Sequence, residues 1–147
     1  MTRYHYTFEE SDDATKVTIY QKDAVAATAT YFPTRDDFEA YSVTKRFQGK
    51  GLSYALTYLL LLYCKDNRRR EPQVSNAHNA LLNSLPQIGF SQEGEVRRIK
   101  RDKEVAATFQ CRNIDRSLEL CKAKMLKAGL IQDGLRLSGD YRWRTLF

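Results

Sequence analysis

The chain has 147 residues, of which 42% are hydrophobic and 29% are charged, and these proportions are typical of a soluble globular protein with one core. Its longest apolar run, residues 59–64, is too short to cross a bilayer. Residues 1–6 lack the apolar segment of a signal peptide. We therefore expect a cytoplasmic protein that does not enter a membrane.

The net charge is +6 and the isoelectric point is about 9.3, so a polyanion such as coenzyme A or RNA is a candidate partner. Basic residues gather at 68–70 and 97–101, although such runs are more often solvated faces than binding sites. The cysteines Cys64, Cys111 and Cys121 are widely spaced and match no metal-binding pattern. We expect them to be reduced and structural, and we expect no metal site.

Four β-strands are predicted in the first third of the chain. They cover residues 4–8, 16–21, 25–32 and about 38–43, which are rich in β-forming residues and tend to alternate. The connections between them are short and have the composition of turns. The sequence therefore predicts an antiparallel meander.

A long helix is predicted over residues 52–67, because apolar side chains recur there at three-and-four spacing. Since this helix is apolar on almost every side, we expect it to lie between the sheet and another helix. A short strand at residues 73–75 should then return parallel to the fourth strand, as a right-handed β-α-β unit.

A second, short helix is predicted over residues 80–85, with Asn76 or Asn79 as its N-cap and with Pro86 ending or kinking it. A hairpin around residues 101–103 is expected to follow, with strands at residues 95–100 and 105–111.

The C-terminal region is predicted to be an amphipathic helix over residues 114–128, capped by Gly129, and a last hairpin within residues 135–144. With no repeat or linker in the sequence, residues 1–147 should form a single domain. Its core would cover about 1–112 and a C-terminal extension about 113–147. We expect the extension helix to cover the outer side of the long helix.

One stretch has the composition of a phosphate-binding loop. It links the fourth strand to the long helix and reads Gln48-Gly49-Lys50-Gly51-Leu52-Ser53. Its two glycines allow the backbone to approach a ligand closely, and a helix N-terminus adds partial positive charge at the same place. The stretch lacks the Lys-Ser/Thr ending of a P-loop and the third glycine of a dinucleotide-binding turn.

This loop resembles the Gln/Arg-x-x-Gly-x-Gly/Ala signature of the GCN5-related N-acetyltransferase (GNAT) superfamily, with Ser53 in the last place. The later Gly89-Phe90 pair and the order of strands support the resemblance, which covers about residues 26–110. It implies an α/β (α+β) fold with a mixed, mostly antiparallel sheet and a central β-α-β unit. It also implies transfer of an acetyl group from acetyl-CoA to a primary amine.

The resemblance further implies where acetyl-CoA would bind. The pyrophosphate would lie on the backbone of residues 48–53, and the pantetheine arm would pair with residues 41–43 like an additional strand. Such pairing requires the fourth and fifth strands to separate. The implied cofactor-binding residues are Tyr41, Ser42, Val43, Gln48, Gly49, Lys50, Gly51, Leu52 and Ser53.

For catalysis, a base must deprotonate the amine. Asp37 lies eleven residues before Gln48, at a position where histone-type members of the family carry a glutamate, and Glu39 follows on the same strand face. Either is a candidate base, acting through water. Both are equally consistent with ordinary solvent-exposed carboxylates at a strand edge.

Two features depart from the family pattern. Leu85 stands where the family often has the tyrosine that protonates the leaving thiolate, and neither Asn83 nor Ser84 beside it is a good acid. His78 is expected near the cleft, where a capping or surface role is the simpler interpretation.

Family members also place one or two helices between their first two strands, and residues 9–15 leave no room for them. The acceptor pocket should therefore be open, which suits a macromolecule.

Three functions remain as hypotheses. The first is an N-acetyltransferase acting on a protein or a charged tRNA. The second is a GNAT-fold binding protein that has lost catalysis. The third is a basic nucleic-acid-binding module. A homodimer is also a candidate arrangement, because Trp143 and Phe147 near the C-terminal end could pack against a second copy.

Overall fold

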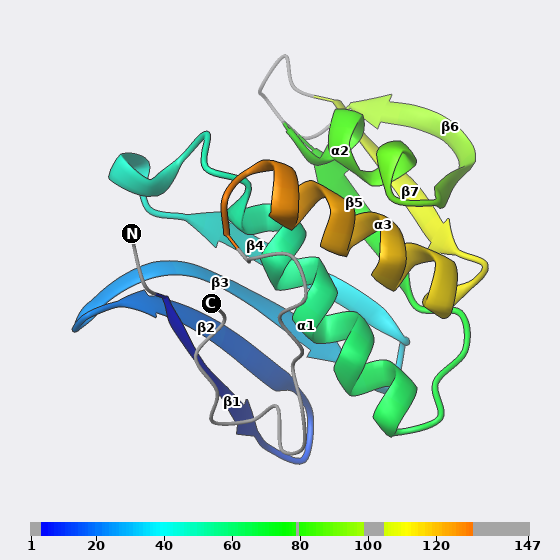
Figure 1. Ribbon diagram of the computed structural model, residues 1–147. Helices are drawn as coiled ribbons and strands as arrows, with labels where there is room; N and C mark the ends of the chain where they lie inside the picture. The colour runs from blue at the N-terminus through cyan, green and yellow to red at the C-terminus, as the bar shows by residue number, and fades with distance from the viewer. Residues whose placement is uncertain (1–3, 79, 99–104, 131–147) are drawn as a thin grey trace.

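The computed structural model describes residues 4–78, 80–98 and 105–130 (Figure 1). In chain order its elements are β1 (His5–Glu10), β2 (Thr15–Gln21), β3 (Ala24–Phe32), β4 (Asp37–Val43), the 3-10 helix η1 (Lys45–Phe47), α1 (Leu52–Asp66), β5 (Gln73–His78), α2 (Leu81–Gln87), β6 (Phe90–Arg98), β7 (Val105–Cys111) and α3 (Ile114–Lys127).

The strands of the described residues form one seven-stranded sheet in the order β1-β2-β3-β4-β5-β7-β6. The predicted meander is confirmed, since β1 to β4 pair antiparallel in sequence. The β-α-β prediction is also confirmed, because β5 runs parallel to β4 after α1. No helix separates β1 from β2; the turn between them is closed by a hydrogen bond from the Ser11 N–H to the Ala14 carbonyl at 2.9 Å.

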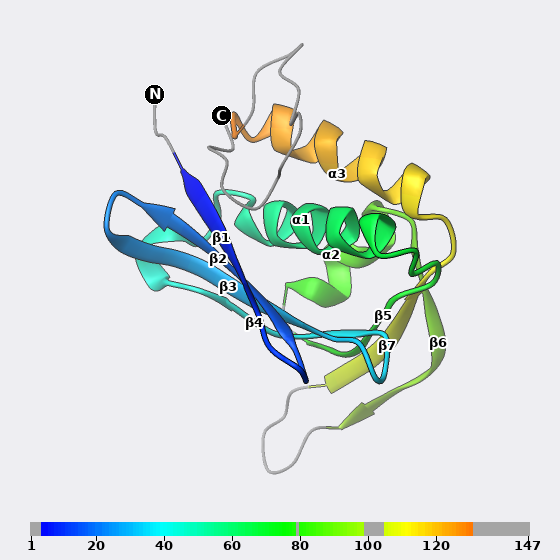
Figure 2. The same cartoon turned by 90° about the horizontal axis from the view of Figure 1, so that it is seen from below.

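The helix α1 lies between the sheet and α3, as Figure 2 shows. Leu59, Leu60 and Leu61 are all fully buried. Consecutive helical residues point about 100° apart, so a run of three requires cover on more than one side. The sheet supplies one cover. The other comes from α3, whose Leu118 and Met125 are buried. The predicted role of the extension helix is therefore confirmed.

The middle of the chain differs from its prediction in two details. The strand β5 continues to His78, so Asn76 lies inside a strand and does not cap α2. The helix α2 passes through Pro86 and ends at Gln87. Pro86 removes one N–H donor from the last turn, and the helix ends one residue later. Asn79, residues 101–103 and residues 135–144 lie outside the described residues.

The three cysteines are buried and free of disulfides. Burial raises the pKa of Cys64, Cys111 and Cys121 above the ordinary thiol value. Each therefore stays a neutral thiol that packs as a small apolar side chain. None of the helices in the described ranges is long and apolar enough to span a bilayer.

The strands β4 and β5 are joined at one end by a buried carboxylate. Asp37 accepts hydrogen bonds from the Ser75 N–H at 2.9 Å and from the Ser75 hydroxyl at 2.5 Å. The guanidinium of Arg35 lies 3.8 Å away. Burial raises the pKa of Asp37 above its usual range, although the two bonds from Ser75 oppose this effect. Asp37 therefore closes the junction between the strands.

This raised pKa gives a test of the role of Asp37. The folded protein binds the proton on Asp37 more tightly than the unfolded chain, so ionisation of Asp37 costs folding free energy. We expect the wild type to lose stability relative to Asp37→Asn as the pH rises from about 3.9, the ordinary Asp pKa, through the raised value. Urea unfolding of both proteins between acidic and neutral pH measures the difference. A relative gain in wild-type stability with rising pH would contradict this role.

Candidate functional site

Beyond the Asp37 junction the two central strands separate. Asp37 and Gln73 are the single registered pair between β4 and β5. The register of β3 with β4 shifts between Thr28 and Thr30, and Ala40 of β4 has a φ of 56°. A bulge of this kind bends and twists its strand. The bend carries the rest of β4 away from β5, and the separation required by strand-like cofactor binding is present.

A cleft of about 840 Å³ occupies this separation. Its walls come from β4, the following loop, the first turn of α1, β5 and α2. The lining residues are Phe38, Glu39, Ala40, Tyr41, Val43, Phe47, Gln48, Gly49, Gly51, Leu52, Ser53, Tyr54, Val74, Asn76, His78, Ala80, Leu81, Asn83, Ser84 and Gln87.

The structure brings most of the predicted cofactor-binding residues to this cleft. Those that line it are Tyr41, Val43, Gln48, Gly49, Gly51, Leu52 and Ser53. Two do not: Ser42 pairs with Thr28 of β3, and the Lys50 side chain is exposed. Of the two candidate bases, Glu39 lines the cleft and Asp37 does not.

The loop after β4 is held firmly at its base. The Thr44 hydroxyl donates to the Val25 carbonyl at 2.8 Å, and the Gln48 side-chain amide donates to the Val43 carbonyl at 3.1 Å. Phe47 is buried, with its ring edge against Tyr4. A loop anchored in this way presents its backbone in a fixed orientation, so little ordering entropy is lost when a ligand binds.

The glycines give the loop its shape. Gly49 has a φ of 75° and Gly51, the N-cap of α1, has a φ of 81°, which side-chain-bearing residues adopt only at a cost. Within the described part of the chain, the N–H groups of residues 49–53 donate to no other group. Free N–H groups at a helix N-terminus attract anions. The loop is therefore a preformed anion cradle at the end of the cleft.

Tyr41 fastens β4 to α1 through its side chain. Its hydroxyl lies 2.7 Å from that of Thr57, and the Thr57 hydroxyl donates to the Ser53 carbonyl at 2.9 Å. The Tyr41 hydroxyl must therefore be the donor to Thr57. Burial raises the Tyr41 pKa, so this phenol keeps its proton. The side chain of Tyr41 therefore holds β4 against α1, and only its backbone groups are available to hydrogen-bond a ligand.

Glu39 sits at the opening of the cleft in a polar network. It accepts hydrogen bonds from Arg35 at 2.5 Å and from the Asn76 side chain at 3.1 Å. Asn76 in turn accepts from Arg97 at 2.8 Å. Arg97 also donates to the Ser75 carbonyl, where the pairing of β5 with β7 is irregular. Glu39 is thus an oriented carboxylate, in contrast to the freely solvated side chain considered from sequence.

His78 is the main functional candidate that the sequence prediction undervalued. It ends β5 and lines the cleft, and its Nδ1 atom is buried with no hydrogen-bond partner in the described part of the chain. A buried polar atom without a partner is uncommon in proteins. The sequence placed His78 near the cleft, but because the strand was expected to end at residue 75, it did not indicate that the Nδ1 atom would be buried. Leu85, by contrast, is fully buried and packs in the core.

No protein-family model matches the chain, and no curated protein sequence matches it. Several solved structures have a similar fold. An acetyltransferase assigned to the GNAT family from Desulfovibrio desulfuricans superposes with a TM-score of 0.58 at 18% identity, over 69% of each chain. The chain has the GNAT fold.

Two other solved structures share this fold over more of the chain. BjaI, a CoA-dependent acyl-homoserine lactone synthase solved with SAM and isopentyl-CoA, has a TM-score of 0.61 at 16% identity, covering 87% of this chain and 72% of its own. FeeM, an N-acyl amino acid synthase from uncultured soil microbes, has a TM-score of 0.57 at 10% identity, covering 86% and 83%. At these identities the comparisons establish the GNAT fold predicted from the loop.

The anion cradle can be tested at Gly49. A Cβ atom there would meet no heavy atom within 4 Å, so Gly49→Glu adds charge and backbone strain without a steric clash. We expect it to weaken binding of coenzyme A by at least about 100-fold, because a like charge would face the phosphates. Isothermal titration calorimetry measures the change.

Gly94→Glu is the matched control, because Gly94 has a φ of 73°, has equally open surroundings, and lies in β6 outside the cleft lining. It should bind coenzyme A as the wild type does. Equal affinity of the Gly49 variant and the control would exclude the cradle as the phosphate site. At Gly51 the same change is less clean, since a Cβ would lie 3.0 Å from that of Ala128.

Proposed function

We propose that this protein is an N-acetyltransferase that transfers an acetyl group from acetyl-CoA to a primary amine. The observation that carries the proposal is the cleft between β4 and β5, which ends at a cradle of free N–H groups. An elongated ligand with phosphates at one end and an amide-bearing arm matches such a site. Acyl-CoA has this shape and charge, and BjaI, one of the structural neighbours, was solved with isopentyl-CoA.

In this proposal the described residues divide the work of binding. The N–H groups of residues 49–53 would hold the pyrophosphate, and the backbone of residues 41–43 would pair with the amides of the pantetheine arm. The apolar side chains of Phe38, Val74 and Leu81 line the cleft and would surround the thioester end. Water exclusion there would strengthen each polar contact to the reacting groups.

Acyl transfer requires two proton movements. The amine must lose a proton before its lone pair attacks the thioester carbonyl, and the departing thiolate must gain one when the carbon–sulfur bond breaks. Glu39 is the better placed of the two predicted bases, because Asp37 is buried outside the cleft with both oxygens occupied by Ser75. The imidazole of His78 offers a second group that can accept or donate a proton.

No tyrosine stands at the position where the family usually has its acid, although Tyr54 also lines the cleft. Leu85 occupies that position in the core, and the proton of Tyr41 is committed to Thr57. Because the usual acid is missing, a second candidate function remains: a GNAT-fold protein that binds coenzyme A without transferring an acyl group. The two differ in one observable, the appearance of acetylated product.

The acceptor we propose is an amine on a macromolecule, either a protein or a charged tRNA. The support is the short connection between β1 and β2, where the chain places a turn instead of helices. Without those helices we expect room for a large acceptor. Glu39, which lines the cleft and accepts a hydrogen bond from Asn76, would attract an ammonium group before it loses its proton.

Turnover is tested with acetyl-CoA and three acceptors: a lysine-containing peptide, an aminoacylated tRNA and a small polyamine. We expect acetylated product in mass spectrometry, and we expect Glu39→Gln to lower kcat/KM by roughly 100- to 10,000-fold, the usual contribution of a general base. His78→Gln is run in parallel to compare the two groups. Binding of acetyl-CoA without product from any acceptor would favour the non-catalytic candidate, and no binding at high micromolar concentration would refute both.

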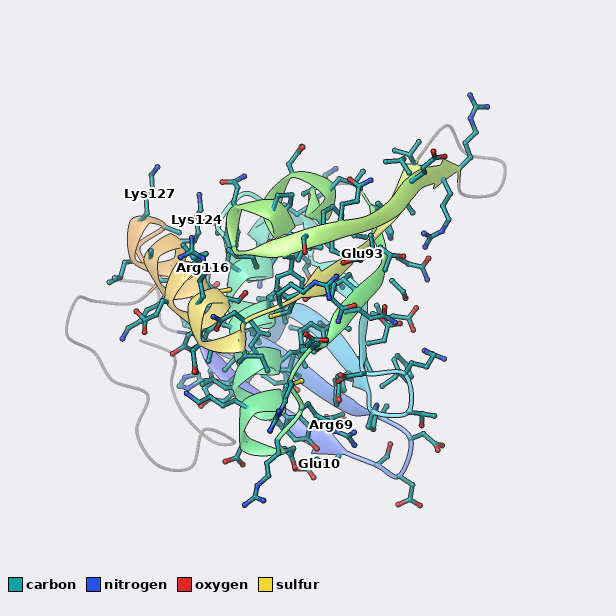
Figure 3. All side chains as sticks on the ribbon, turned by 90° about the vertical axis from the view of Figure 1, so that its right-hand side faces the viewer. Glu10, Arg69, Glu93, Arg116, Lys124 and Lys127 are labelled. Carbon is teal, nitrogen blue, oxygen red and sulfur yellow. The ribbon has the colours of Figure 1, made fainter. Side chains whose placement is uncertain are left out.

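A further candidate function, RNA binding, is favoured by one surface. Arg68, Arg69 and Arg70 are exposed and form no ion pair within the described ranges. With Arg112 they line a hollow of about 620 Å³ in which the four arginines outnumber two carboxylates, Asp36 and Glu71. Figure 3 shows Arg69 well away from Lys124 of α3. We propose that this surface holds the phosphates of an RNA acceptor.

This surface predicts a salt-dependent affinity for tRNA. Each phosphate contact contributes about 0.7 to 0.9 to the slope of log affinity against log salt. Arg69→Gln/Arg70→Gln should therefore reduce the slope by about 1.4 to 1.8. The matched control, Lys16→Gln/Lys22→Gln, removes the same charge from exposed positions elsewhere and should leave the slope unchanged. Equal slopes in the two double variants, measured by fluorescence anisotropy, would exclude this surface.

A further inference from the structure

We propose that Lys124, on the C-terminal helix α3, is a phosphate ligand for the coenzyme A bound in the cleft. The inference rests on the proposed function and adds to it a residue from outside the phosphate-binding loop. It assigns the C-terminal extension a direct part in binding. The shared chemistry of the ligand is a phosphate oxygen, from either the pyrophosphate or the ribose 3′-phosphate.

Lys124 reaches two residues that line the cleft. Its Nζ donates to the Gln87 side-chain oxygen at 2.6 Å and lies 5.9 Å from the centre of the Tyr54 ring. Gln87 ends α2, and Tyr54 is in the first turn of α1. Figure 3 labels Lys124 at the end of α3, near Lys127. Lys124 does not itself line the cleft, but its ammonium contacts two side chains of the cleft wall, one of them in the first turn of α1.

Contacts of α3 with Gly51 and Gly89 hold the helix in place and so fix the position of Lys124. At its C-terminal end, the Cβ atom of Ala128 lies 3.0 Å from the position that a Cβ atom on Gly51 would occupy. Farther back along α3, the Ser117 and Leu120 side chains lie 3.1 and 3.4 Å from the corresponding point on Gly89. α3 thus touches both the cradle and the turn after α2. These contacts fix the position of α3 relative to the first turn of α1 and to the end of α2.

The positive charges of Lys124 and of the N-terminus of α1 have no acidic partner among the described residues. A cation beside a helix N-terminus is unfavourable, because both are positive. The first turn of α1 contains no acidic residue, and Lys124 forms no ion pair with any described carboxylate. Its only described hydrogen-bond partner is the neutral Gln87. Since an ammonium has three N–H donors, two are left for a ligand, and a phosphate would balance both the lysine and the helix terminus.

The experiment compares Lys124→Met with the matched control Lys122→Met. Lys122 is on the same helix, is also partly buried, and has no described contact with a residue lining the cleft. Calorimetric titrations use coenzyme A and dephospho-coenzyme A. We expect Lys124→Met to weaken coenzyme A binding about 10- to 100-fold, as for loss of a charge-assisted hydrogen bond, and Lys122→Met to stay within about twofold of the wild type.

Two further measurements separate phosphate binding from a purely structural role. Lys124→Arg keeps the charge and should bind within a few-fold of the wild type. The deficit of Lys124→Met should also shrink as salt concentration rises, because salt screens a charge–charge contact. A structural role would give a deficit that salt does not change, and that result would overturn the proposal.

The two ligands identify the phosphate. An equal deficit for both assigns Lys124 to the pyrophosphate, and a deficit for coenzyme A alone assigns it to the 3′-phosphate. Wild-type affinity in Lys124→Met overturns this inference while leaving the proposed function intact. Failure of the wild type to bind coenzyme A overturns both.

Discussion

The Asp37–Ser75 contact governs the centre of the molecule. Two hydrogen bonds from Ser75 hold β4 and β5 together at one end, and the bulge at Ala40 turns β4 away immediately afterwards. A sheet paired along its whole length would leave no room for a ligand. The opening between these strands therefore depends on one buried carboxylate and one strained residue, and everything proposed about ligand binding depends on that opening.

The C-terminal helix compensates for what the N-terminal half lacks. With only a turn between β1 and β2, the outer side of α1 would be exposed, and its leucines would face water at a cost of about 1.5–3 kcal/mol for each fully exposed side chain. α3 covers that side through Leu118 and Met125. The same helix reaches the cleft with Lys124. One addition to the chain thus serves both stability and, in our proposal, ligand binding.

Positive charge gathers in two regions of the described surface, to which we propose different ligands. At the cradle, free N–H groups and Lys124 gather positive charge beside an apolar cleft. At the opposite end of α1, the arginines of residues 68–70 lie near a helix C-terminus, where cations are favoured. The first region has concave shape and directed donors, which suit a small ligand. The second is open and its arginines are exposed, which suits a long polyanion.

The sequence by itself determined the elements and the loop. Alternation and helical spacing are local properties, so the meander, α1 and α3 could be predicted, and the Gly49 and Gly51 pattern located the cradle. Only the tertiary structure decided which side chains meet there. Asp37 and Glu39 are two residues apart on one strand, yet the Ser75 contact buries one while the other lines the cleft. Lys124 and His78 join the site through packing between segments far apart in the chain, and no local pattern records such packing.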